Sequence, residues 1–189
     1  MIKETPWMQI SVRFDIDQIG NQLDYTFSSS DESTQPKEGR YSGGVYFCQG
    51  QHVYFDVTGS GSKDSGYTSF QVVDCCIMTR PKVNQAGGGM PTRYSPPSPF
   101  LQAIGATFPM ALDFSSIVTL ERERPYRHIR QDWKRSLNVA HTGGHWEISM
   151  LITVRILRGD TASPELRVFS FDPEGSVGGG TGWDEQPGS

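Results

Sequence analysis

The stretch 145–157 constrains the fold more than any other part of the chain. Apolar residues occupy every second position in it, and mostly polar residues lie between them. This period of two is typical of a long β-strand with one buried face. Only Leu151 and Leu157 place large apolar side chains on the opposite, wetter face, and a second apolar run, 166–171, follows a turn at 158–160. The sequence therefore predicts a β-hairpin that closes an antiparallel sheet.

The rest of the chain fits the same architecture. With 21 glycines and 12 prolines in 189 residues, it suits short strands joined by turns better than a helical bundle. We expect an all-β sandwich of two antiparallel sheets, of the jelly-roll or Greek-key type, in one domain over 1–173, followed by a flexible glycine-rich tail at 174–189. The predicted inward-facing residues are Val12, Phe14, Phe55, Val57, Phe70, Val72, Ile148, Met150, Ile152, Val154 and Phe169.

Four other segments carry specific expectations. The segment 80–99 contains five prolines and three consecutive glycines, which indicates a long irregular loop and a first place to look for a ligand. The run 59–66 is expected to be a flexible connection. The segments 44–48 and 52–58 are expected to be strands joined at 49–51, either as a hairpin or as one bent strand with a bulge. The charged segment 121–137 is compatible with a strand pair or with one short helix after its proline.

Charge and composition bear on location and partners. The formal net charge is −4, so attraction to a polyanion is not the default expectation. The N-terminal residues lack the apolar core of a signal peptide, and no apolar run reaches the length of a membrane helix. We therefore expect a cytoplasmic protein without membrane association. Cys48, Cys75 and Cys76 are expected to be reduced thiols packed as small hydrophobic residues.

One block is rich in cations and aromatic rings. Its basic residues are Arg122, Arg124, Arg127, Arg130, Lys134 and Arg135. Such a block could bind phosphates and stack nucleic-acid bases. Because three acidic residues dilute it and the whole chain is acidic, we favour a solvated face or a salt-bridged surface between subunits over nucleic-acid binding.

The sequence offers little support for catalysis or metal binding. His141 and His145 have a ligand-like spacing, but two glycines between them indicate a turn rather than a metal-binding helix face. No serine lies in a nucleophile elbow, and the glycine runs lack the lysine and helix of a phosphate loop. We expect no catalytic residues, no metal and no cofactor, and hence a protein that is not an enzyme.

The C-terminal hairpin also carries a family resemblance. Its strands, 146–157 and 166–173, resemble the closing segment of the AidA/PixA inclusion-body protein family, whose members typically end on an aromatic strand running into Asp-Pro. The segments 11–17 and 50–55 agree with that family, although Gln51 replaces its usual acidic residue and the charged block has no counterpart. The resemblance implies a bacterial cytoplasmic β-sandwich, sometimes deposited in inclusions, with no established catalytic residues.

Three hypotheses of function follow. The leading one is a non-enzymatic homo-oligomer with an assembly or storage-like role, in which sheet edges and the basic block supply contacts. The second is a lectin-like module that binds a carbohydrate or small molecule on the aromatic residues Tyr94, Trp133 and Trp183. The third is nucleic-acid association through the basic block.

Overall fold

The computed structural model describes residues 5–30, 44–84, 93–94, 96–103, 105–115, 118–119, 125–140, 144–159, 163–172 and 174–177. These residues form strands, turns and extended segments, and none of them is helical. The described part therefore contains no helix that could span a membrane. The segment 121–137, where strand and helix were both open, contains strands instead.

Six strands form the first sheet, in the order β2-β1-β4-β9-β8, with β10 paired to β4. Their bounds are β1 Trp7–Asp15, β2 Asp24–Ser29, β4 His52–Ser62, β8 Val118–Thr119, β9 Tyr126–Asp132 and β10 Leu137–Asn138. Most neighbours are antiparallel, but β1 and β4 run parallel over their whole contact.

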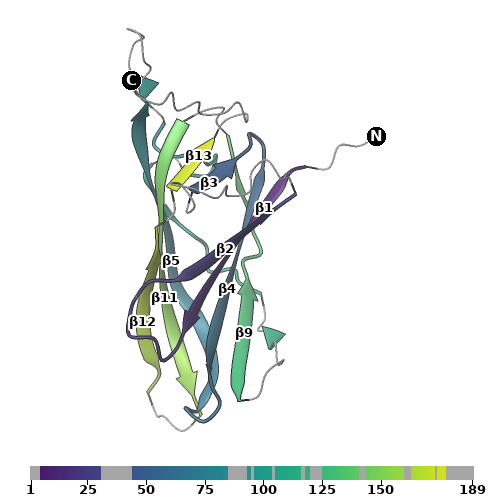
Figure 1. Ribbon diagram of the computed structural model, residues 1–189, viewed down its shortest axis with the longest axis vertical. Helices are drawn as coiled ribbons and strands as arrows, with labels where there is room; N and C mark the ends of the chain where they lie inside the picture. The colour runs from purple at the N-terminus through teal and green to yellow at the C-terminus, as the bar shows by residue number, and fades with distance from the viewer. Residues whose placement is uncertain are drawn as a thin grey trace, which may run out of the picture.

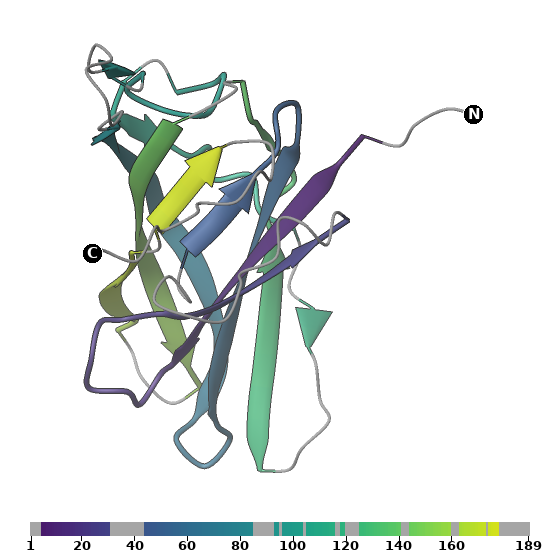
Figure 2. The same ribbon diagram turned by 45° about the horizontal axis from the view of Figure 1, so that its top comes forward.

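Seven strands form the second sheet, in the order β3-β13-β11-β5-β6, with β12 also paired to β11 and β7 to β5. Their bounds are β3 Gly44–Phe47, β5 Tyr67–Asn84, β6 Arg93–Tyr94, β7 Thr107–Pro109, β11 Gly144–Arg158, β12 Glu165–Phe171 and β13 Glu174–Val177. The two sheets pack as a sandwich, with β5, β11 and β12 on one side and β1, β4 and β9 on the other (Figures 1 and 2). This confirms the predicted all-β two-sheet sandwich.

The predicted hairpin is confirmed at the level of register. β11 and β12 are antiparallel, with Met150 opposite Phe171 and Ile156 opposite Glu165. All the residues predicted to face inward are buried, whereas Leu151 and Leu157 are each 38% exposed. The period of two therefore separated the two faces of this strand correctly.

Aromatic rings join the sheets at the centre of the core. The Phe14 ring of the first sheet stacks on Phe169 with 4.8 Å between centroids and meets Phe70 edge-on at 5.2 Å. Tyr25 of β2 approaches Phe171 of β12 at 5.5 Å. Edge-to-face and offset pairs of this kind stabilise a core beyond the burial of their area.

Several local expectations were wrong. Residues 59–62 belong to β4 rather than to a flexible connection, because Tyr67 and Phe14 pack where a side chain would lie: a Cβ on Gly59 would be 2.7 Å from the Tyr67 hydroxyl and 2.8 Å from the Phe14 ring. β3 and β4 do not form a hairpin, since they lie in different sheets. The intervening Gln51 is fully buried, and its amide oxygen accepts a hydrogen bond from the Cys48 N–H.

The predicted loop and the predicted tail both begin with residues that in fact belong to strands. β5 continues to Asn84, past the expected loop start at residue 80, and Pro81 lies opposite Trp146 in the sheet. β13 occupies residues 174–177, at the start of the expected tail, and pairs with β11 and β3. The remaining tail residues and most of the loop lie outside the described residues.

A β-bulge shifts the alternation of β5. The register against β11 passes from Asp74 opposite Thr153 to Val72 opposite Val154, which leaves Val73 as the extra residue. On one side of the bulge Val72 faces the core, and on the other side Cys75 does. The adjacent Cys76 consequently faces outward, and none of the three cysteines forms a disulfide.

Candidate functional site

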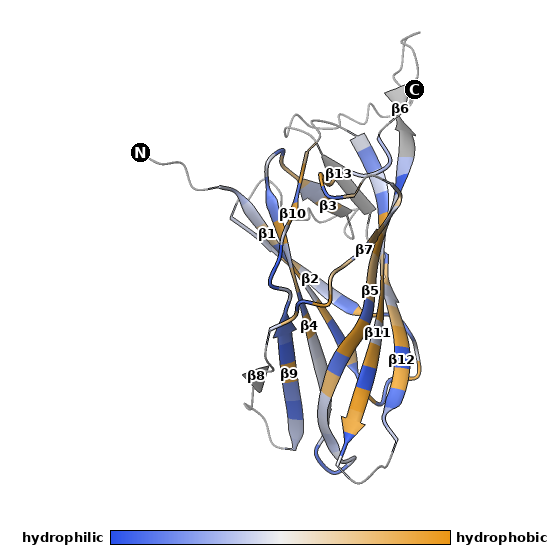
Figure 3. Ribbon diagram, turned by 180° about the vertical axis from the view of Figure 1, so that it is seen from behind, coloured by the Kyte–Doolittle hydropathy of each residue, from blue (hydrophilic) through white to orange (hydrophobic). Residues whose placement is uncertain are grey.

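The outward face of the second sheet carries an apolar patch. Leu166 and Val168 of β12 are 61% and 51% exposed, and they lie beside Leu151 and Leu157 of β11. Arg155 pairs with Leu166 and Thr153 with Val168, so the leucines of β11 are diagonal neighbours of the β12 side chains. The hydropathy colouring in Figure 3 shows apolar residues of both faces along β11 and β12, whereas β9 on the other sheet is mostly hydrophilic. We call Leu151, Leu157, Leu166 and Val168 the apolar patch.

The patch borders a strand edge with available backbone groups. At Ser170, the N–H donates to the Asn21 carbonyl oxygen at 2.8 Å and the carbonyl oxygen accepts from the Leu23 N–H at 2.8 Å, so both groups point away from β11. Backbone groups alternate in direction along a strand, so those of Val168 and Leu166 point the same way. Within the described residues, no strand pairs with this part of β12.

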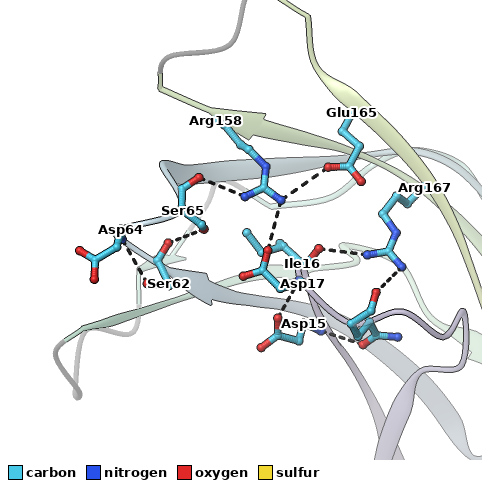
Figure 4. Close-up of polar contacts among 10 residues, drawn as sticks. Asp15, Ile16, Asp17, Ser62, Asp64, Ser65, Arg158, Glu165 and Arg167 are labelled. Carbon is cyan, nitrogen blue, oxygen red and sulfur yellow. Dashed lines mark hydrogen bonds and ion pairs between the residues drawn. The ribbon is translucent and has the colours of Figure 1, made fainter.

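Arg167, between these two residues, points the other way and fixes the edge (Figure 4). Its guanidinium donates to the carbonyl oxygens of Ile16 at 3.0 Å and Gln18 at 2.7 Å and lies 4.7 Å from the centre of the Phe169 ring. A guanidinium with this many acceptors is well suited to hold a turn against a strand. These contacts attach the turn after β1 to β12 on the side of the strand opposite Leu166 and Val168.

A second arginine pairs with two acidic side chains at this end of the molecule. Arg158 lies 3.4 Å from an Asp17 carboxylate oxygen and 3.6 Å from one of Glu165, and it donates to the Ser65 carbonyl oxygen at 3.1 Å (Figure 4). The acidic side chain at the start of β12 is thus ion-paired within the molecule. Leu166 and Val168 remain exposed beside it, and their nearest outward charge on β11 is the exposed Arg155, which is opposite Leu166 and donates to Gln71 Oε1 at 3.4 Å.

The outward face of the first sheet is organised differently. Asp56 of β4 points outward yet is only 1% exposed, because its Oδ2 accepts hydrogen bonds from Gln9 Nε2 at 2.8 Å and Ser11 Oγ at 2.5 Å. The Arg130 guanidinium lies 3.5 Å from the same oxygen and 2.6 Å from Asp132 Oδ1. Three strands are therefore tied together by one buried carboxylate and its partners.

Beside this network lies an open groove of about 370 Å³, to which four strands contribute. Its polar lining consists of Arg13 and Asp15 from β1, Asp24 from β2, Ser60 from β4, and Tyr126 and His128 from β9. Ser60 Oγ and His128 Nδ1 are 2.8 Å apart and hydrogen-bonded. Sequence reasoning missed this groove, because its residues come from strands far apart in the chain and from a run expected to be a loop.

The structure accounts for four of the six predicted basic residues, and all four have partners within the molecule. Arg127 donates to the carbonyl oxygens of Tyr67 and Thr68 at 3.2 Å, and Arg130 pairs with the aspartates described above. Lys134 and Arg135 each lie 3.5 Å from an Asp113 carboxylate oxygen. Arg122 and Arg124 lie outside the described residues. The four placed cations therefore all have partners within the molecule, with Lys134 and Arg135 sharing Asp113, and they do not form an unpaired patch.

The three predicted ligand-stacking aromatics are not brought together. Trp133 is 4% exposed, meets Phe55 edge-on at 6.0 Å, and donates its indole N–H to the Ala111 carbonyl oxygen at 2.8 Å. A ring packed in this way belongs to the core and offers no face to a ligand, because Ile129, Gln131 and Trp133 share the buried side of their segment. The Tyr94 side chain and Trp183 lie outside the described residues.

Titratable groups give no metal site within the described ranges: no group of three His, Cys, Asp or Glu side chains there could hold a metal ion. His141 lies outside those ranges. Burial raises the pKa of the Cys75 thiol to about 12 and also raises the pKa of Cys76. Both thiols are therefore mostly protonated at neutral pH, which makes them poor nucleophiles and poor ligands.

Comparison with known proteins finds similarity at the level of structure. No family model and no curated protein matches the sequence. The structure is similar to the crystal structure of the inclusion body protein PixA from Burkholderia cenocepacia J2315, with a TM-score of 0.42 and 11% sequence identity over 94% of this chain and 98% of that chain. This is the family that the C-terminal hairpin resembles. At that identity and TM-score no residue role is transferred, and the surfaces above are described from this chain alone.

Proposed function

We propose that the protein is a non-enzymatic, self-associating protein with an assembly or storage-like role, and that the β12 edge is its contact surface. The observation that carries the proposal is the coincidence of outward backbone groups and exposed apolar side chains at Leu166 and Val168. An edge strand with unpaired backbone groups is a template for pairing with another strand, and proteins that remain monomeric usually protect such edges with charge. A cytoplasmic location remains a prediction from the sequence.

A second copy of the chain fits this edge by symmetry. Two β12 strands that meet antiparallel about a two-fold axis would extend the second sheet across both molecules. Such pairing would place Leu166 and Val168 against the same residues of the second copy, which removes their apolar surface from water. Apolar burial contributes roughly 25 cal/mol per Å², so these contacts would add to the backbone hydrogen bonds.

Sedimentation over a range of protein concentrations tests the proposal. We expect the mass of the wild-type protein to rise with concentration, and the double variant Leu166→Lys/Val168→Lys to remain a monomer because two lysines on the edge repel a second copy. The matched control is Thr26→Lys/Ser28→Lys, which adds the same charges to exposed positions of β2, the edge strand of the first sheet. This control should associate like the wild type.

Two results would overturn the proposal in different ways. A wild-type protein that is strictly monomeric at every concentration would remove self-association altogether. Association that persists in the β12 variant, or that is lost equally in the β2 control, would show that the contact surface lies elsewhere.

A further inference from the structure

We infer that the groove on the outward face of the first sheet binds a neutral polyhydroxylated molecule, of the size of a mono- or disaccharide. The groove holds about 370 Å³, within the range of roughly 300 to 1,000 Å³ typical of small-molecule sites. It lies on the opposite sheet from the β12 edge, so this inference does not depend on the proposed self-association.

Some charged side chains in the groove have donor or acceptor atoms that no described residue uses. The neighbouring charged side chains outside the groove are already paired. Asp56 and Arg130, on the same face, are paired with each other and with further partners. The side chains of Arg13 and Asp24, by contrast, are opposite each other in the β1–β2 register and make no hydrogen bond or ion pair with any described residue. Asp15 uses Oδ1 to accept from the Asp17 N–H at 2.8 Å, which leaves Oδ2 for a ligand (Figure 4). The groove therefore offers carboxylate acceptors and guanidinium donors together.

The Ser60–His128 pair adds a fixed polar group to this set. The hydrogen bond between Ser60 Oγ and His128 Nδ1, at 2.8 Å, orients the imidazole ring on the outward face of adjacent strands. Either direction of that hydrogen bond leaves Nε2 for another partner, as an acceptor or a donor according to the tautomer. Hydroxyl groups, which both donate and accept, match such a group.

Tyr126 gives the groove an aromatic wall. It is 45% exposed at the start of β9, beside the polar groups described above. A ring that is half-exposed at the mouth of a groove combines an apolar face with a polar hydroxyl. A pyranose ring has the complementary structure, with an apolar face of C–H groups and a rim of hydroxyls.

The composition of the groove disfavours other classes of ligand. Asp15 and Asp24 repel a phosphate or carboxylate, and Arg13 repels a polyamine or a basic peptide. The described residues hold no group of three metal-ligating side chains, so the acidic residues do not form a cation site on their own. The hydroxyl groups of a neutral ligand can donate to the carboxylates and accept from the guanidinium at the same time, so they match groups of both signs.

Protein-observed NMR on the full chain, at a concentration where the mass is constant, tests this inference. The probes are glucose, galactose, mannose and N-acetylglucosamine, together with maltose, cellobiose, lactose and chitobiose, with inorganic phosphate and spermidine as charged competitors. We expect saturable shifts of the amide signals of Ser60, Tyr126 and His128 with at least one sugar. We expect Tyr126→Ala to weaken that binding by about tenfold or more and Asp24→Asn to weaken it severalfold.

The matched control is Tyr54→Ala, which removes a tyrosine of similar exposure, 38%, from the same face of the first sheet but outside the groove. It should bind the sugar like the wild type. No saturable shift with any of the eight sugars would overturn the inference, as would equal weakening by both tyrosine variants. Saturation of the groove by phosphate or spermidine alone would show that the ligand is charged and would also overturn it.

Discussion

The outward faces of the two sheets follow the same alternation of side chains but treat their surfaces in opposite ways. On the first sheet, the outward Asp56 is 1% exposed because neighbouring polar groups cover it. On the second sheet, outward Leu166 and Val168 remain exposed beside a strand edge. Around Asp56, the first face therefore uses its polar groups for contacts within the molecule, whereas the second face leaves apolar side chains and backbone groups of β12 for contact with a partner. Alternation identifies which residues point outward but not what each face is for.

Among changes to polar contacts, removal of the Asp56 carboxylate should have the largest effect on stability. Asp56→Ala leaves the Arg130 guanidinium and two hydrogen-bond donors without their shared acceptor, so we expect a loss of about 3 kcal/mol in the free energy of unfolding, as for other broken buried pairs. Urea denaturation measures it. Asp113→Ala, which removes an exposed partner of Lys134 and Arg135, should cost less than about 1 kcal/mol. Equal losses would refute the contrast.

A smaller effect is expected for Arg167→Met, which tests how the β12 edge is fixed. The change keeps an apolar side chain near Phe169 but removes the hydrogen bonds to the Ile16 and Gln18 carbonyl oxygens. We expect a loss of about 1 to 2 kcal/mol and faster hydrogen exchange in the turn after β1. Unchanged exchange in that turn would show that Arg167 does not hold it.

The exposed apolar side chains of β12 should contribute little to the stability of the monomer. We expect Leu166→Thr/Val168→Thr to change the free energy of unfolding by less than about 0.5 kcal/mol, measured by urea denaturation at a low protein concentration. Ile152→Ala truncates a buried side chain of β11 opposite Phe169, and this change should cost about 2 to 5 kcal/mol. A large loss in the threonine variant would mean that the patch is part of the core.

Thiol labelling compares the two sides of β5 without altering stability. We expect an alkylating reagent to modify Cys76 in the folded protein and Cys75 only after unfolding, in a Cys48→Ser background, with mass spectrometry of the peptides as the readout. Burial raises the pKa of both thiols, so the thiolate is scarce at neutral pH and the labelling rate of Cys76 should still rise as the pH passes 9.0. A Cys75 that reacts as fast as Cys76 would contradict the assignment of faces.

Local pattern predicted much of this fold. The alternation from Trp146 to Ile156 predicted the correct buried face of β11. The burial of one face of a strand is reflected in the strand's own pattern of apolar and polar residues. The parallel contact of β1 with β4 was not predicted, since pairing between distant strands leaves no local pattern. The strand at Gly59 was read as a loop, because the absence of a side chain there serves the packing of Tyr67 and Phe14 rather than a turn.

The candidate sites were harder to predict. The exposed residues of β12 follow from the hairpin, but the free edge beside them depends on which strands pair elsewhere. The groove draws Arg13, Asp24, Ser60 and His128 from four strands, so no motif contains it. Trp133 was misread because charged neighbours suggested an exposed segment, although the alternation of Ile129 and Gln131 with Arg130 and Asp132 already placed it in phase with the buried side.

The position of β13 has a consequence for synthesis of the chain. Within the described sheet, β3 pairs only with β13, and β13 joins it to β11. One corner of the sandwich is therefore assembled from segments made early and late by the ribosome, with nearly all the other strands between them. Before β13 has been synthesised, the position beside β11 is empty and β3 has no strand to pair with. Completion of this corner must consequently wait until β13 has left the ribosome, and a nascent chain stalled before that point would expose an incomplete sheet edge to its neighbours.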